Sequence, residues 1–177
     1  MGSPTTVSSG SRADASGTHR GTRTFDRVVM GGYTICYVGL LVLAGLDAAR
    51  FGLVVLDGPW VLVGGVLMIV GTVLVAGAMA VNRHLETTVR IQWDRGHEVA
   101  SQGPYRLVRH PMYVGMIVQL PATALLLGSG LALVPASVCV LLLVVRTALE
   151  DRTLVRDLPG YAGYAKTTRY RLVPGIW

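Results

Sequence analysis

The apolar residues of this chain gather in four blocks separated by polar segments. The blocks cover residues 28–49, 59–81, 112–127 and 131–145, and the second contains no charged side chain. About 20 apolar residues form a helix long enough to cross a bilayer, and the first two blocks reach this length. The last two blocks are shorter, at roughly 16 and 15 residues. The pattern predicts an all-α, polytopic integral membrane protein with about four transmembrane helices.

The two short blocks are separated only by the turn Gly128-Ser129-Gly130. This spacing predicts a helical hairpin that is tilted or ends short of the far membrane surface. Pro121 and Pro135 are expected to kink its two helices, which neighbouring helices tolerate inside a membrane.

Composition and charge support a membrane class. Hydrophobic residues make up 51% of the 177 residues and charged residues 15%, which is too apolar for an ordinary soluble domain. Of the 16 Lys and Arg residues, only Arg50 lies between the first two blocks, and none lies in the glycine turn. The positive-inside rule therefore places the N-terminus, the central loop and the C-terminus on the cytoplasmic side of the cell membrane. The net charge of +6 is expected to face the anionic headgroups of membrane lipids. Nucleic-acid binding is therefore not needed to explain this charge.

The chain divides into three parts. Residues 1–24 are rich in Ser, Thr and Gly and are expected to form a disordered tail. Residues 25–82 hold the first two membrane helices, with Asp47 expected as a charge at the membrane interface. Residues 83–177 hold the candidate chemistry. No Cys or His residues have the spacing of a metal site.

Two polar segments carry the candidate chemistry. The stretch from Gly103 to Gly115 places polar side chains and two prolines against the start of an apolar block, where polar groups are costly and usually functional. It follows a segment, residues 82–91, that is expected to form a helix lying in the membrane interface. Pro111 suits the first turn of a helix, whose N–H groups favour an anion.

The second polar segment continues the fourth block beyond the apolar region. Arg146 and Glu150 are four residues apart and share a helix face. Pro159-Gly160 follows, and then Tyr161 and Tyr164, which are expected to close the C-terminal segment over the site.

These motifs resemble the isoprenylcysteine carboxyl methyltransferase family and the related phospholipid methyltransferases. The similarity covers roughly residues 80–177 and rests on the following motifs: Gly103-Pro104-Tyr105, Arg109-His110-Pro111-Met112-Tyr113-Val114-Gly115, Arg146 with Glu150-Asp151 and Leu154, Tyr161 with Tyr164, and Val173-Pro174. Asp151 stands where the family usually has a second Glu, so its shorter side chain is expected to be a doubtful contact.

The resemblance implies a membrane methyltransferase that uses S-adenosylmethionine and has no Rossmann domain. In such enzymes the cofactor lies on the cytoplasmic side, between the loop into the third span and the C-terminal segment. The resemblance places cofactor contacts at Pro104, Tyr105, Leu107, His110, Tyr113 and Glu150. It assigns Arg109 and Arg146, together with Glu150, to the catalytic set, with the two arginines serving structure or the carboxylate of the substrate.

The acceptor is expected to be a lipophilic molecule that enters from the bilayer, with the carboxylate of a prenylcysteine-like compound as the first choice. Phospholipid N-methylation is one alternative, and an NADPH-dependent reductase of the sterol-reductase type is another. A third is a non-enzymatic membrane protein that retains the motif as architecture. The composition, rich in Ala, Val, Gly and Arg, favours a bacterial member.

Overall fold

The computed structural model describes residues 24–82 and 99–177. The predicted N-terminal tail, apart from Thr24, lies outside the described residues. So does the predicted interfacial helix of residues 82–91, apart from Asn82.

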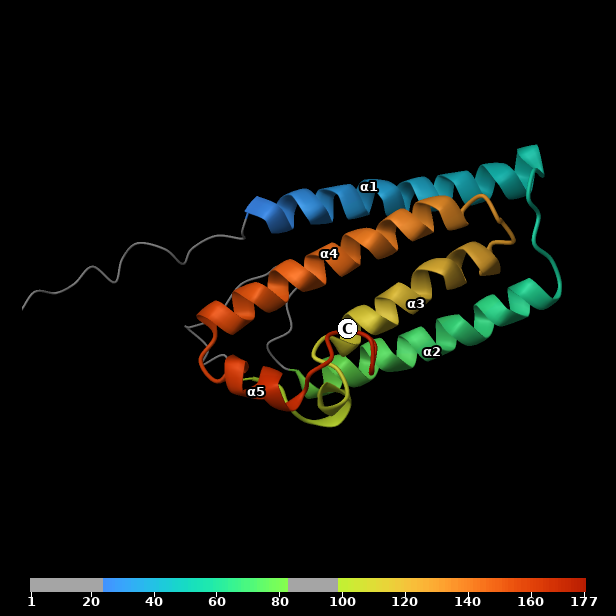
Figure 1. Ribbon diagram of the computed structural model, residues 1–177. Helices are drawn as coiled ribbons and strands as arrows, with labels where there is room; N and C mark the ends of the chain where they lie inside the picture. Colours follow the sequence, from blue (N-terminus) through green and yellow to red (C-terminus); the bar gives the residue numbers. More distant parts are fainter. Residues whose placement is uncertain (1–23, 83–98) are drawn as a thin grey trace, which may run out of the picture.

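In the described residues, the helices α1, α2, α3 and α4 run alternately in opposite directions along one bundle (Figure 1). A π-helical turn extends the first helix, a 3-10 turn precedes the third, and a short helix follows the fourth. In chain order the elements are α1 (Thr24–Leu46), η1 (Asp47–Phe51), α2 (Pro59–Val81), η3 (Gly103–Arg106), α3 (Pro111–Leu126), α4 (Leu133–Asp157) and α5 (Tyr161–Thr167). We call the end where α1 and α3 begin and α2 and α4 end the α5 end of the bundle, and the opposite end the far end.

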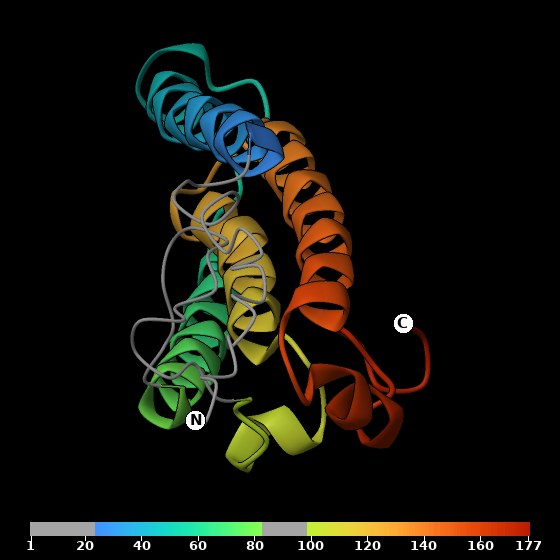
Figure 2. The ribbon, with the colours of Figure 1, turned by 90° about the vertical axis from the view of Figure 1, so that its left-hand side faces the viewer.

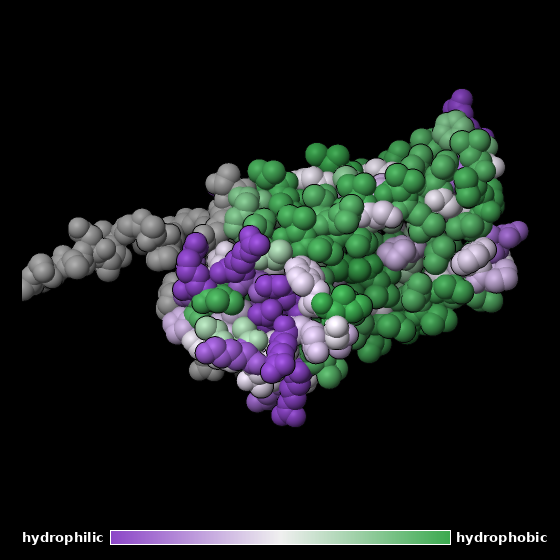
Figure 3. Space-filling model, in the orientation of Figure 1, coloured by the Kyte–Doolittle hydropathy of each residue, from purple (hydrophilic) through white to green (hydrophobic). Residues whose placement is uncertain are grey.

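The bundle has the lengths and surface of a membrane protein. Phe25–Phe51, Pro59–Val81 and Leu133–Asp157 are long and apolar enough to cross a bilayer, whereas the apolar helix Pro111–Leu126 is shorter. Apolar side chains cover most of the visible bundle surface, and hydrophilic side chains gather at the α5 end (Figure 3). The predicted all-α polytopic architecture is confirmed. The fourth apolar block forms the first part of α4, which continues to Asp157 as a charged helix.

The closest helix packing lies between α2 and α3 and depends on glycine. A Cβ atom at Gly71 would lie 2.6 Å from Cγ of Gln119 and 2.8 Å from the carbonyl oxygen of Gly115. A Cβ atom at Gly64 would lie 2.8 Å from Cβ of Leu125. Small residues let membrane helices approach to this distance, where dispersion between the backbones replaces contacts with lipid. The short α3 is thereby fixed along α2.

Asp47, near the end of the first candidate membrane span, joins the loops at the far end. Its side chain is fully buried, with Oδ1 accepting a hydrogen bond from the Leu53 N–H at 2.9 Å and Oδ2 accepting one from the Ser129 hydroxyl at 2.6 Å. The Gly130 N–H donates to the Val54 carbonyl at 2.7 Å between the same two loops. The helical hairpin is therefore anchored to the end of α1 through a carboxylate.

The prediction that Pro135 kinks its helix is wrong, because this proline lies in the first turn of α4. The N–H groups of a first turn have no partner within the helix, so proline removes no hydrogen bond there. Pro121 does lie inside α3, as predicted.

The α2–α3 contact predicts different costs for two similar substitutions on α2. Gly71→Ala is expected to lower the free energy of unfolding by about 1–3 kcal/mol, because the new methyl group meets the backbone of α3. Gly77→Ala is the matched control, since no heavy atom lies within 4 Å of a Cβ placed there. Thermal unfolding in detergent measures both, and equal melting temperatures for the two variants would contradict the close approach.

Candidate active site

The polar residues predicted from the sequence meet at the α5 end. The loop into α3, the last turns of α4, α5 and the C-terminal segment come together there, as both ribbon views show (Figures 1 and 2). Two groups of side chains form this region, and each contains one of the neighbouring acids Glu150 and Asp151.

Backbone hydrogen bonds to the C-terminal segment hold the loop into α3. Arg109 N–H donates to the Tyr170 carbonyl at 2.9 Å, and His110 N–H donates to the Arg171 carbonyl at 3.0 Å. Pro111 begins α3, and His110 precedes it outside the helical region, with φ of −126° and ψ of 60°. The predicted helix start is therefore confirmed, and residues more than 60 positions away fix it.

Asp151 is the centre of the first group. Its Oδ1 lies 3.2 Å from Nη1 of Arg109 and 3.3 Å from Nε2 of His110, and its Oδ2 accepts a hydrogen bond from Nε of Arg171 at 2.8 Å. The Tyr161 hydroxyl donates to Oδ1 at 3.0 Å. The carboxylate is 1% exposed, so its charge is compensated almost entirely by these side chains. We call this set the Asp151 cluster.

Tyr161 and Tyr164 of α5 cover the Asp151 cluster and donate hydrogen bonds as neutral hydroxyl groups. Burial raises the pKa of Tyr161 well above its usual range, and the neighbouring Asp151 charge acts in the same direction. Burial also raises the pKa of Tyr164 to about 12. The protonated Tyr164 hydroxyl donates to the Tyr105 carbonyl at 2.7 Å, which ties α5 to η3.

Glu150 belongs to the second group, on another side of α4. The Tyr113 hydroxyl donates to Oε2 of Glu150 at 2.6 Å, and the Arg146 guanidinium lies 5.3 Å from the centre of the Tyr113 ring. Nε of Arg146 donates to Oδ1 of Asp26 in α1 at 2.9 Å. The His110 ring stacks on Tyr113, with centroids 5.8 Å apart, and connects the two groups. We call Asp26, Tyr113, Arg146 and Glu150 the Glu150 cluster.

Among the residues that the structure describes, the two clusters carry opposite excess charge. Counted over the described residues, the Asp151 cluster holds two guanidinium groups and one carboxylate, and Nε of Arg109 is buried without a hydrogen-bond partner. The Glu150 cluster holds two carboxylates and one guanidinium, and Glu150 is only half-buried. Where the dielectric constant is low, two neighbouring clusters of opposite charge favour a ligand that presents an anionic and a cationic group close together.

Most of the predicted site residues are brought together. Arg109, His110, Tyr113, Arg146 and Glu150 all belong to the two clusters.

Three other predicted residues lie at the edge of the clusters. Tyr105 is buried beneath α5, and its hydroxyl accepts a hydrogen bond from the Asn82 side chain at 3.3 Å. Pro104 lies beside it in η3, half-buried. Leu107 is 68% exposed, so its side chain does not reach either cluster.

The sequence interpretation missed Asp151 and Asp26. It treated Asp151 as a doubtful contact because the side chain is short, yet this carboxylate has the most partners of any acid in the site. Asp26 was not singled out. The sequence did contain a signal for both acids. Arg109 and Arg146 lie next to apolar segments, and an arginine that is buried there needs a carboxylate partner.

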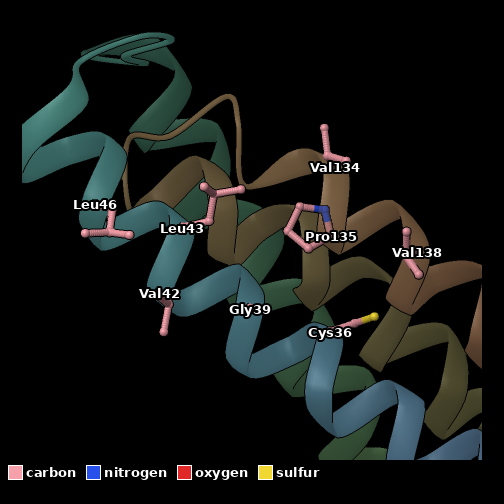
Figure 4. Close-up of a pocket in the computed structure, with 8 residues that line it drawn as sticks. All are labelled: Cys36, Gly39, Val42, Leu43, Leu46, Val134, Pro135 and Val138. Carbon is pink, nitrogen blue, oxygen red and sulfur yellow. The ribbon is translucent and has the colours of Figure 1, made fainter.

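An apolar groove lies away from this site, toward the far end. It has a volume of about 490 Å³ between α1 and α4, and Cys36, Gly39, Val134, Pro135 and Val138 are among its lining residues (Figure 4). Val134 and Pro135 belong to the first turn of α4, whereas both clusters use its last turns. The groove has no polar lining and offers nothing to bind a polar cofactor.

The fold and the buried charges define an all-α, polytopic membrane protein with a polar site at one end of its helix bundle. A family model described as phospholipid methyltransferase matches residues 59–158, which is more than half of the chain. The chain belongs to this family and is a membrane methyltransferase. No curated protein matches the chain.

Substitution of Asp151 tests its place at the centre of the site. Asp151→Asn is expected to lower the free energy of unfolding by about 3–5 kcal/mol, because two guanidinium groups lose their shared carboxylate. Asp57→Asn, at an exposed aspartate in the far-end loop, is the control and should change stability by about 0.5 kcal/mol or less. Melting curves in detergent that coincide for the two variants would contradict the assignment.

Proposed function

We propose that this protein transfers a methyl group from S-adenosylmethionine to a lipophilic acceptor at the α5 end of the bundle. The family supports methyl transfer within a membrane. The observation that carries the proposal is the half-buried Glu150 carboxylate, bonded to Tyr113 beside the His110 ring and next to a cluster of opposite excess charge.

The donor set fits this cofactor. S-adenosylmethionine presents a carboxylate, an ammonium group and a sulfonium, and when bound it supplies a methyl group on positively charged sulfur. The partner-free Nε of Arg109 suits the carboxylate, and Glu150 with its excess negative charge suits a cationic group. The stacked faces of His110 and Tyr113 offer an apolar and polarisable wall between the two.

The loop residues complete this proposal. The backbone of residues 104–107, including Pro104, Tyr105 and Leu107, would line the cofactor pocket, because Tyr164 holds the Tyr105 carbonyl in place. Leu107 would contribute its backbone only, since its side chain points into the surroundings.

The protein's task in such a reaction is alignment and exclusion of water. A carboxylate acceptor is already ionised and needs no base. An amine acceptor must lose a proton, and Glu150 is the better candidate to accept it, because His110 Nε2 is already engaged with Asp151 and Tyr161.

An acceptor held in the bilayer reaches this site sideways through the apolar surface, while a polar cofactor approaches from water at the α5 end (Figure 3). Arg106 and Arg169 are exposed at this end and favour an anionic acceptor group, such as the carboxylate of a prenylcysteine-like molecule. The distribution of Lys and Arg supports a cytoplasmic position for the α5 end in this proposal. Phospholipid N-methylation is the second candidate.

The proposed cofactor is tested by calorimetry, which measures the binding of S-adenosylhomocysteine to the detergent-purified protein. The wild type is expected to bind, and Glu150→Gln to bind about tenfold more weakly or worse, because a charged hydrogen-bond acceptor is lost. His110→Ala should also bind more weakly, since it removes the stacked ring.

The Asp57→Asn protein serves as the matched control and should bind like the wild type. A well-folded wild type that fails to bind S-adenosylhomocysteine but binds NADPH would replace methyl transfer by the reductase alternative.

The acceptor is tested with S-adenosylmethionine labelled in the methyl group. Vesicles containing phosphatidylethanolamine and a micellar prenylcysteine analogue are offered separately. We expect label in the prenylcysteine analogue that mild base releases as methanol, because a methyl ester is base-labile. Base-stable label in the phospholipid fraction alone would instead establish N-methylation of a headgroup.

A further inference from the structure

Arg171 is the most exposed member of the Asp151 cluster. Its side chain is 29% exposed, whereas those of Arg109, His110 and Asp151 are 8%, 6% and 2% exposed. The sequence motifs give Arg171 no role, and the phospholipid methyltransferase match ends before it, at residue 158. A ligand that approaches the cluster from outside therefore meets an arginine that has no assigned task.

Two contacts fix the guanidinium of Arg171. Its Nε donates a hydrogen bond to Oδ2 of Asp151 at 2.8 Å, and its central carbon lies 5.1 Å from the centre of the Trp177 ring. A tight hook of the C-terminal segment places that ring, because the N–H groups of residues 171, 172 and 173 all donate to the Trp177 carbonyl, at 2.9, 3.0 and 3.2 Å. The positive charge is thus held in one place before any ligand arrives.

The outer edge of this guanidinium carries unused donors. Among the described residues, Asp151 is the only hydrogen-bond acceptor of the Arg171 side chain, and it engages Nε. The two terminal NH₂ groups remain, and their planar arrangement matches the oxygens of a carboxylate or a phosphate. A fixed arginine that presents these groups at the edge of a site is suited to recognise an oxyanion.

We propose that Arg171 is a specificity-determining residue that binds the anionic group of the lipophilic acceptor, a carboxylate or a phosphate. The inference rests on the proposed function and names the group by which the acceptor is recognised. It also divides the tasks of the two arginines in the Asp151 cluster. The buried Arg109 suits the carboxylate of the cofactor, and Arg171 at the rim suits the anion of the acceptor.

The surroundings of Arg171 suit an anion that is attached to an apolar body. Val173 and Ile176, in the same hook, are 46% and 81% exposed. Apolar bundle surface also borders the hydrophilic side chains at the α5 end (Figure 3). Hydrocarbon that lies against these side chains keeps water from the ion pair, and an ion pair is stronger where the dielectric constant is low. A water-soluble anion lacks this cover, so the site favours a lipophilic one.

The test measures binding without turnover, by calorimetry in detergent. Two pairs of ligands differ in the anion. One pair is a prenylcysteine analogue and its carboxamide, and the other is a short-chain phosphatidic acid and the diacylglycerol with the same chains. For at least one pair, the wild type is expected to bind the anionic member about tenfold more tightly than the neutral member, because a charged hydrogen bond is lost in the neutral one. Preference in the first pair identifies a carboxylate as the recognised group, and preference in the second identifies a phosphate.

Arg171→Gln should reduce this preference to about twofold or less, because the charge and the planar pair of donors are lost. Arg152→Gln is the matched control, since it removes the same charge from an exposed arginine at the α5 end, and it should keep the full preference. A purely structural role for Arg171 would leave the ratio within each ligand pair unchanged, and this result would overturn the inference. So would an Arg171→Gln protein that loses affinity for S-adenosylhomocysteine but keeps its preference for the anionic ligand.

If Arg171→Gln does not fold, Arg171→Lys replaces it. A lysine ammonium can still pair with Asp151 but lacks the planar pair of NH₂ groups, so the preference should again fall. A folded Arg171→Lys protein with the preference of the wild type would count against the inference.

Failure of the proposed function looks different. In that case the wild type does not bind S-adenosylhomocysteine, and the role of Arg171 toward an acceptor falls with it. A wild type that binds S-adenosylhomocysteine but shows no preference in either ligand pair removes only the role of Arg171.

Discussion

A carboxylate that is buried at the end of a membrane helix bundle is stable only when positive charge and hydrogen-bond donors surround it. Asp151 obtains them from the loop before α3 through Arg109 and His110, from α5 through Tyr161, and from the C-terminal segment through Arg171. Three segments, among them a loop about 40 residues away in sequence, are thus fixed around one side chain of α4. The polar end of the molecule is organised around this charge in the way that the far end is organised around Asp47.

The membrane explains which interactions hold the rest of the described bundle together. Lipid tails are as apolar as the helix surfaces, so burial of apolar area between helices supplies little driving force. The close approach of α2 and α3 at Gly64, Gly71 and Gly115 supplies dispersion instead, and buried carboxylates anchor each end. The short α3 can therefore hold Tyr113, and His110 just before it, at a defined position, although it is shorter than the three candidate membrane spans.

Much of the architecture could be predicted from the sequence, because apolar block length and turn residues are local signals. The helix pair around Gly128-Ser129-Gly130 and the helix start at Pro111 are examples. The predicted residues Arg109, His110, Tyr113, Arg146 and Glu150 also meet in one region.

The partners of these residues could not be predicted in the same way. The sequence interpretation placed Arg146 and Glu150 on one helix face, and the structure adds Asp26, 120 residues away in sequence, as a hydrogen-bond partner of Arg146. Pairing across helices depends on how α1 is rotated against α4, and no local pattern encodes that rotation.

Glu150 and Asp151 show how one helix can support two opposite electrostatic environments. Successive residues of an α-helix point about 100° apart, so neighbouring acids at the end of α4 face different surroundings. Asp151 faces the arginines of the loop and the C-terminal segment, where its charge is more than neutralised. Glu150 faces the Tyr113 hydroxyl and lies beside Arg146, which also donates a hydrogen bond to Asp26. This division requires α4 to continue as a helix well beyond its apolar part, since a helix that ended at residue 145 would present neither acid to the site.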